Sequence, residues 1–178
     1  MRRFLILYFI LICFAVLSKF YAFFINFVYL ILVLPIGFYD FEKLGFKNFR
    51  KGFFYGIFSS LFYLPFIITK FPIGAFAQLP YVFAEEVFFR GYGLTVINER
   101  LKNIHISNIV ISVLFTVPHV IINPSLFSVL VFFPSVIFGY LFFYSKSILA
   151  SVIFHWLSNV FFQVFFYEFL VRKVMVSI

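Results

Sequence analysis

Six side chains of the kinds found in hydrolytic active sites lie within runs of sequence that are otherwise apolar. They are Glu85, Glu86, Arg90, His119, His155 and Asn159. Placing a charged side chain at the centre of a membrane-spanning helix costs about 2.5–3.5 kcal/mol on insertion scales, so such residues are read as functional by default. A carboxylate and two imidazoles from three separate helices could converge on one water molecule.

The two adjacent glutamates are expected to have different roles. Glu86 and Arg90 are four residues apart with the acid first, which is the favourable order for an ion pair on a helix. Arg90 should therefore keep Glu86 charged, and Glu86 is expected to be an orienting partner in the site. Arg90 lies near the end of its apolar run, so the alternative is that its side chain snorkels to the membrane surface. Glu85 has Phe89 at the matching position and no such partner. It is the candidate general base.

The histidines lie in two further apolar runs. Pro118 removes a backbone donor and is expected to kink or end the helix just before His119. His155 and Asn159 are four residues apart and share a helix face, so the amide could fix the imidazole or donate to a developing oxyanion. Each histidine taken alone fits a structural hydrogen bond between helices equally well.

Five other residues are of types found at functional sites but are assigned structural roles. His105 follows a polar turn and is expected at the membrane interface, and Trp156 is expected to pack beside the site helix. Gly91 and Gly93 favour close helix packing over phosphate binding. Cys13 lies in an apolar run and is expected to fill the core.

The elements that must position these side chains are membrane helices. Of the 178 residues, 65% are hydrophobic and 11% are charged, whereas a soluble domain is about half apolar and about a quarter charged. At about 20 residues for each crossing, the chain is predicted to be an all-α, multi-pass bundle of roughly seven transmembrane helices. We expect one transmembrane domain over residues 1–178. The apolar runs are at about 4–18, 20–39, 52–69, 79–97, 104–122, 126–144 and 147–171.

Charge placement predicts the orientation and the partners. The net charge is +8, and the basic residues stand at the ends of the apolar runs. This distribution favours contact with anionic lipids and disfavours nucleic-acid binding. No small-x-small cleavage site precedes Lys19, so a retained first helix is favoured over a secretory signal. A cytoplasmic amino terminus puts most flanking Lys and Arg residues inside.

The depth of the site along the helices is less clear from the sequence. At a rise of about 1.5 Å per residue, Glu85 and His119 fall far from the basic end of the bundle. His155 falls nearer the middle or the opposite end. We therefore assign no side for substrate entry.

Three short patterns together resemble a known family. Glu85-Glu86-x-x-x-Arg90, Phe115-x-x-x-His119 and His155-x-x-x-Asn159 occur in this order on successive predicted helices. The pattern resembles that of the CAAX-protease and bacteriocin-processing family of intramembrane proteases, also called the CPBP or Abi family. The resemblance covers a catalytic core of about residues 79–163, and the first three runs match only in hydrophobicity.

The resemblance implies hydrolysis of a peptide bond at a site enclosed by transmembrane helices. In this family the residues matching Glu85 would activate water, with Glu86 and Arg90 in support. The best-understood members remove the last three residues from prenylated proteins that end in a CAAX box, and others are associated with bacteriocin immunity or maturation. The implied partners are therefore membrane lipids and a peptide or prenylated protein substrate.

The same resemblance implies roles for the remaining site residues. His119 and His155 would position the water or bind a metal, and Asn159 would help to hold the oxyanion. Glu85, His119 and His155 are the candidate ligands of a divalent metal such as zinc, but the chain has no His-Glu-x-x-His helix. The sequence leaves open both a metal-dependent and a metal-independent reaction.

Two other functions compete with the protease. A non-catalytic bacteriocin-immunity or scaffold protein could keep the fold of the family without its chemistry. A proton-coupled transporter could also use intramembrane Glu and His residues as a relay. It is disfavoured because the sequence lacks paired, Gly/Pro-interrupted helices in two related halves.

Overall fold

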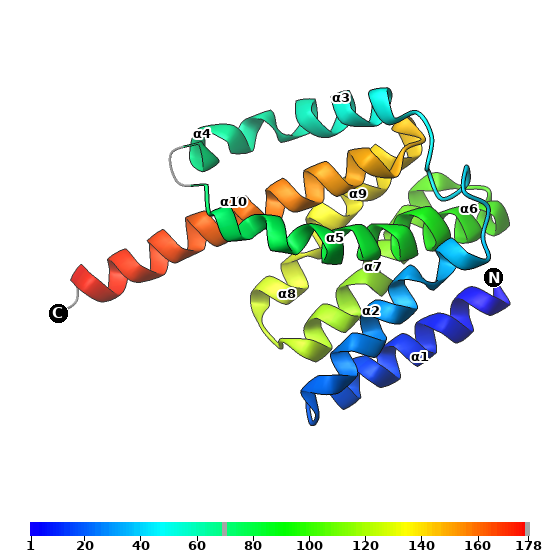
Figure 1. The fold of residues 1–178 in the computed structure, drawn as a ribbon, viewed down its shortest axis with the longest axis horizontal. Coiled ribbons are helices and arrows are strands. Elements are labelled where there is room, and N and C mark those ends of the chain that lie inside the picture. The colour runs from blue at the N-terminus through cyan, green and yellow to red at the C-terminus, as the bar shows by residue number, and fades with distance from the viewer. Residues whose placement is uncertain (69–70, 177–178) are drawn as a thin grey trace.

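The fold is a bundle of helices, as the composition predicts (Figure 1). The computed structural model describes residues 1–68 and 71–176, with side chains described as far as residue 165, and these ranges contain no strand. Short 3-10 turns connect several helices, and a buried π-helical segment, η5 (Val87–Leu94), joins α5 to α6. The helices are α1 (Arg2–Ser18), α2 (Ile25–Val33), α3 (Phe49–Ser60), α4 (Leu64–Ile67), α5 (Leu79–Glu86), α6 (Thr95–Leu101), α7 (Ile104–Ile122), α8 (Leu126–Leu130), α9 (Phe132–Ser145) and α10 (Ile148–Val176).

The apolar runs of the sequence correspond to these helical segments. Three segments of the described chain are long and apolar enough to cross a membrane: Ile104–Ile122, Leu126–Ser145 and Ile148–Phe165. The others are shorter or are interrupted by 3-10 turns. The all-α fold is thus confirmed and three segments are candidate membrane spans, while a count of seven crossings stays a prediction.

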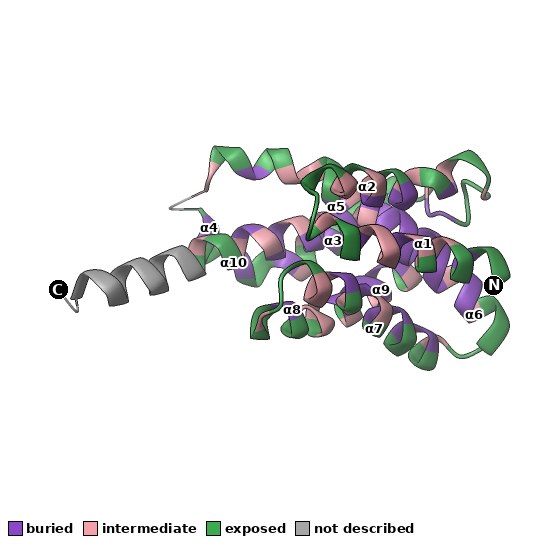
Figure 2. Cartoon of the chain, turned by 90° about the horizontal axis from the view of Figure 1, so that it is seen from below, coloured by how far each residue is buried: buried purple, intermediate pink, exposed green. Residues whose placement is uncertain are grey.

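The outer surface of the bundle is apolar. Figure 2 shows buried residues along the inner helices and exposed residues on their outward faces. Large side chains such as Phe9, Phe58 and Phe133 are among the exposed ones. An apolar surface of this extent is unusual for a soluble monomer and suits contact with lipid tails.

Several basic residues gather at one end of the bundle, whereas Lys19 lies at the opposite end of α1, and the orientation in the membrane stays a prediction. The amino terminus, the start of α3, the end of α6 and the turn between α9 and α10 lie at this end (Figure 1). Lys43 pairs with Glu99 at 2.7 Å, and the Lys51 ammonium donates to the Tyr144 carbonyl at 2.8 Å.

The depth expected for His155 needs correction. The loop before α3 reaches into the bundle, where Gly45 accepts a hydrogen bond from the Ile148 backbone N–H at 3.0 Å. Its neighbour Leu44 lies against Gly91 in the middle of η5. Helix α10 therefore begins level with Gly91 and not with the end of α6, which places His155 at the depth of Glu85.

The two glycines of η5 serve close packing, as predicted. A Cβ atom on Gly91 would lie 2.8 Å from the Leu44 carbonyl oxygen, and one on Gly93 would lie 2.6 Å from Ile111 Cδ1 and 2.8 Å from the Phe4 ring. All residues of η5 are buried. Single π-helical turns are frequent at functional sites, and this one follows Glu86 directly.

Replacing Gly91 by alanine should destabilise the bundle. The added methyl group meets backbone, which cannot move aside as a side-chain end can, so we expect a loss of about 1–3 kcal/mol. Thermal unfolding in detergent measures the effect. Gly74→Ala is the matched control because a Cβ there meets nothing within 4 Å, and equal unfolding temperatures for both variants would contradict the packing role.

Pro118 does not end its helix. Of the two predicted effects, an end of the helix just before His119 is wrong, because α7 continues to Ile122, and a kink stays a prediction. The proline has no N–H to offer the carbonyl of Leu114 one turn earlier. That carbonyl instead accepts a hydrogen bond from the Tyr8 hydroxyl at 3.0 Å. The hydrogen bond between Tyr8 and the Leu114 carbonyl thus joins α1 to α7, the helix that carries His119.

Candidate active site

A fully buried ion pair forms the base of the site. Arg90 Nη1 lies 3.1 Å from Glu86 Oε1, and both side chains are 0% exposed. Arg90 Nη2 also donates to the Ser135 hydroxyl at 2.7 Å, and the guanidinium lies between the rings of Phe115 and Phe138. The pairing predicted from the spacing is confirmed, and the alternative that Arg90 snorkels to the surface is wrong.

His155 is held by the same pair. Its Nδ1 lies 2.8 Å from Glu86 Oε1, and its ring stacks on Phe138 with centroids 4.4 Å apart. A carboxylate only accepts hydrogen bonds, so Nδ1 carries a proton, and in the neutral ring Nε2 then presents a lone pair. The imidazole is therefore fixed by Glu86, and not by Asn159 as one of the sequence alternatives proposed.

His119 is oriented by its own helix. Its Nδ1 donates to the Phe115 backbone carbonyl at 2.9 Å, which again leaves the Nε2 lone pair free. This Nε2 lies 4.0 Å from one oxygen of Glu85, while His155 Nε2 lies 3.6 Å from the other. Both imidazoles thus turn their acceptor nitrogens toward the Glu85 carboxylate.

Glu85 differs from Glu86 in its access to open space. Its side chain is 21% exposed, whereas that of Glu86 is fully buried. Both nitrogen-to-oxygen separations at Glu85 are longer than a hydrogen bond, and a contact of this length between polar groups points to a bridging water. The arrangement suits a water molecule held by one carboxylate and two imidazoles.

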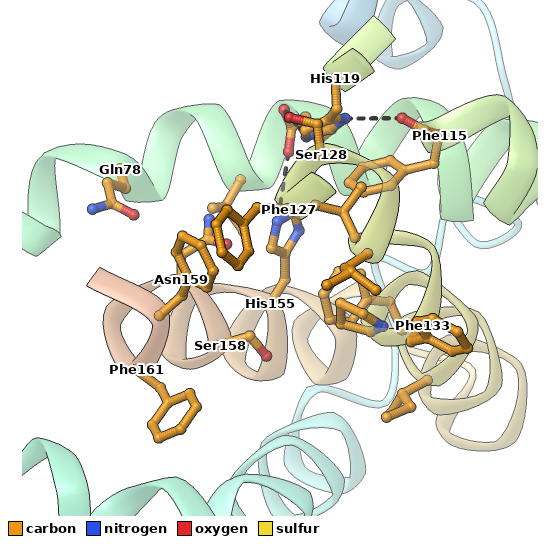
Figure 3. Close-up of a pocket in the computed structure, with 18 of the residues that line it drawn as sticks. Gln78, Phe115, His119, Phe127, Ser128, Phe133, His155, Ser158, Asn159 and Phe161 are labelled. Atoms are coloured by element: carbon orange, nitrogen blue, oxygen red, sulfur yellow. Dashed lines mark hydrogen bonds and ion pairs between the residues drawn. The ribbon is translucent and has the colours of Figure 1, made fainter. Parts of the chain in front are cut away.

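Asn159 lies one helical turn beyond His155, on the same cavity wall (Figure 3). Among the side chains that the structure describes, none is hydrogen-bonded to its amide. The structure thus brings Glu85, Glu86, His119 and His155 together with Asn159 beside them. The Asn159 amide is available to a ligand in the cavity.

The site opens into a large cavity of about 720 Å³ between α5, α8, α9 and α10 (Figure 3). At its rim the Gln78 amide donates to the Gln163 side-chain oxygen at 3.0 Å. The lining is mostly apolar. Apart from the site residues, it includes Tyr29, Tyr63, Tyr81, Phe127, Leu130, Val131, Phe133, Ile137, Phe161, Phe162 and Phe165.

Whether the site binds a metal stays a prediction. Over the residues described, no three His, Cys, Asp or Glu side chains are placed to hold a metal ion. Glu85, His119 and His155 face one another as hydrogen-bonding groups, and we assign no step of the chemistry to a metal.

Two residues of the site were not found from the sequence. Ser135 binds the guanidinium of Arg90 with its hydroxyl, and its carbonyl lies 3.2 Å from the same nitrogen. Phe138 packs on both Arg90 and His155. A serine and a phenylalanine in an apolar run give no signal of their own, because both are common in helices that only pack.

His105 and Trp156 lie outside the site, and Cys13, which was expected to fill the core, is only partly buried. His105 is exposed and its ring nitrogen lies 2.8 Å from the Tyr140 hydroxyl. Trp156 donates to the Ala75 carbonyl at 2.9 Å and packs on Phe76. Neither residue lines the site cavity.

A helical bundle with candidate membrane spans, and with a partly exposed carboxylate and two oriented imidazoles beside an apolar cavity, defines a candidate membrane hydrolase. Comparison with protein families identifies which one. The model of the type II CAAX prenyl endopeptidase Rce1-like family matches residues 63–161, more than half of the chain. The chain belongs to this family, and all six predicted site residues lie within the match. No curated protein and no solved structure matches the chain.

Proposed function

We propose that this protein is an intramembrane endopeptidase that cuts near the carboxyl end of a lipid-anchored or membrane-embedded peptide. The observation that carries the proposal is the convergence of the His119 and His155 acceptor nitrogens on the Glu85 carboxylate, 4.0 and 3.6 Å away. Membership of a family of prenyl endopeptidases supports it.

The reaction begins with a water molecule between Glu85 and the two imidazoles. Glu85 takes a proton from this water while the oxygen attacks the carbonyl carbon of the scissile bond. The carbonyl oxygen becomes an oxyanion and accepts a hydrogen bond from the Asn159 amide. Glu85 then returns its proton to the amide nitrogen as the C–N bond breaks, which releases an amine and leaves a carboxylic acid.

The buried groups act by positioning. Ser135 holds Arg90, Arg90 pairs with Glu86, and Glu86 holds the His155 ring with its Nε2 toward the water. Groups that are held in place before the reaction need no reorganisation when charge develops. Glu86 and Arg90 are therefore positioning residues, and Glu85 is the group that exchanges protons.

The size and the apolar lining of the large cavity favour a lipidated substrate. Its 720 Å³ lie within the range of about 300–1,000 Å³ for small-molecule sites, and aromatic and aliphatic side chains dominate its wall. A prenyl chain attached to the acyl side of the scissile bond suits this lining. Peptide backbone alone would leave most of the apolar surface unfilled.

Matched peptides that end in a CAAX box, one farnesylated and one not, test the function directly. We expect the purified protein to release the last three residues from the lipidated peptide only. Parallel reactions with a strong chelator address the metal, and unchanged rates are expected. If neither peptide is cut in detergent or in liposomes, the proposed function is wrong.

Replacing Asn159 by alanine should slow the chemical step. Removal of one oxyanion donor lowers kcat by about 10²–10³ in other acyl-transfer enzymes, and we expect an effect of this size with little change in KM. Ser158→Ala is the control, because Ser158 lines the same cavity but donates to the Phe154 carbonyl. Equal kcat values for the two variants would contradict the role of Asn159 as a donor to the oxyanion.

A further inference from the structure

A pocket at the basic end of the bundle gathers arginines from two distant parts of the chain. It measures about 550 Å³, and its wall includes Arg2 and Arg3 from the start of α1 and Arg100 from the end of α6. The amino terminus and α6 lie close together in both views of the fold (Figure 1 and Figure 2). This pocket shares no lining residue with the cavity of the candidate active site.

The positive charge of the pocket is not balanced by nearby acids. Within the part of the chain that the structure describes, none of the three guanidinium groups forms an ion pair with a carboxylate. Glu99 is an acidic residue of the wall, but its carboxylate is already paired with Lys43 at 2.7 Å. The pocket therefore attracts an anion.

A buried hydroxyl in the same wall lacks a hydrogen-bond partner. Tyr39 lines the pocket, and its hydroxyl is paired with no other group of the described residues. A buried hydroxyl without a partner costs free energy, which an acceptor oxygen on a ligand would recover. Guanidinium groups are donors only. The wall thus offers hydrogen-bond donors to a ligand that is rich in acceptor oxygens.

A phosphate ester combines the charge, the acceptors and the size that this pocket requires. The planar guanidinium of arginine binds phosphate oxygens in pairs. The volume of 550 Å³ lies within the range of about 300–1,000 Å³ for sites of organic ligands, so the group that carries the phosphate also has room. The rings of Phe38, Tyr39 and Tyr92 complete the wall, and aromatic side chains are frequent at the membrane–water interface.

We propose that this pocket binds a phosphate ester, which is supplied by the headgroup of an anionic lipid or by a soluble phosphate compound. The proposal is independent of the endopeptidase function. A choline headgroup is disfavoured, because it would place its ammonium group beside the arginines.

Thermal unfolding of the purified protein in detergent tests the proposal, because a ligand that binds the folded state raises the unfolding temperature. The probes are phosphatidylglycerol, phosphatidylcholine and soluble glycerol phosphate. We expect phosphatidylglycerol to stabilise the wild type and phosphatidylcholine to have little effect. Arg3→Gln and Arg100→Gln should each weaken the apparent affinity for phosphatidylglycerol by about tenfold or more, as expected for the loss of a hydrogen bond between charged groups.

Arg50→Gln is the matched control. It removes an exposed arginine at the start of α3, at the same end of the bundle, that does not line the pocket. It should keep the wild-type affinity. Tyr39→Phe removes only the unpaired hydroxyl, so it should raise the unfolding temperature of the ligand-free protein and weaken phosphatidylglycerol binding by about two- to tenfold.

The two soluble and lipid probes distinguish the sources of the phosphate. Stabilisation by phosphatidylglycerol alone would identify a lipid headgroup, and stabilisation by glycerol phosphate at similar concentrations would identify a soluble compound. Equal losses in Arg3→Gln, Arg100→Gln and Arg50→Gln would indicate diffuse attraction of anionic lipid to a basic surface and would overturn the site. Equal stabilisation by phosphatidylglycerol and phosphatidylcholine, or none by either anionic probe, would overturn it as well.

Discussion

Replacing Glu85 by glutamine is expected to abolish peptide cleavage while leaving the protein folded. The amide has the shape of the carboxylate but cannot take a proton from water, and loss of a general base costs about 10²–10⁴ in rate. Glu85 is partly exposed, and its contacts with the two imidazoles are 3.6 and 4.0 Å long. Its replacement should therefore leave the unfolding temperature in detergent close to that of the wild type.

The control for this variant is Glu99→Gln, which removes an exposed carboxylate paired with Lys43 at the end of the bundle. It should retain wild-type kcat. A Glu85→Gln protein that keeps more than a tenth of the wild-type rate would contradict the assignment of Glu85 as the general base. Where a biological protection phenotype can be scored, its persistence in Glu85→Gln would support the non-catalytic immunity or scaffold alternative.

Replacing Arg90 by methionine should give the largest loss of stability. It leaves the Glu86 carboxylate fully buried without its cation, and breaking a buried pair in this way costs about 3–5 kcal/mol. Chemical unfolding in mixed micelles measures the difference. Activity should fall as well, because Glu86 orients the His155 ring.

A second substitution separates charge from packing. Glu86→Leu combined with Arg90→Met removes both charges and should recover much of the lost stability, because replacing a buried pair by apolar groups is often close to neutral. Lys43→Met breaks an exposed pair instead and should cost less than about 1 kcal/mol. If Arg90→Met unfolds like the wild type, the buried pair does not stabilise the fold.

Local spacing predicted the parts of the site that lie on one helix. The Glu86–Arg90 pair follows from a separation of four residues, and the helical segments follow from the length of the apolar runs. The contact between His155 and Glu86 joins positions 69 residues apart. Only the order of the three motifs on successive helices hinted at it, through a family resemblance.

Other features depend on how the helices pack and could not be read from spacing. The depth of His155 depends on a loop that enters the bundle beside Gly91, and counting residues from helix ends cannot detect such a loop. Pro118 was expected to kink or end its helix, but α7 continues past it, and a hydroxyl on α1 satisfies the carbonyl that it leaves free. The buried phenylalanines around Arg90 resemble every other phenylalanine of a chain that has 34.

A cavity of about 220 Å³ borders Glu85 on the side of α1 and α2. Its side walls come from Leu11, Ile25, Val28 and Leu32, all of which precede residue 63, where the family match begins. The groups that exchange protons lie within the matched segment. The Glu85 carboxylate therefore borders residues from both parts of the chain, so substitutions in α1 and α2 are expected to change its surroundings without altering the other proposed site residues.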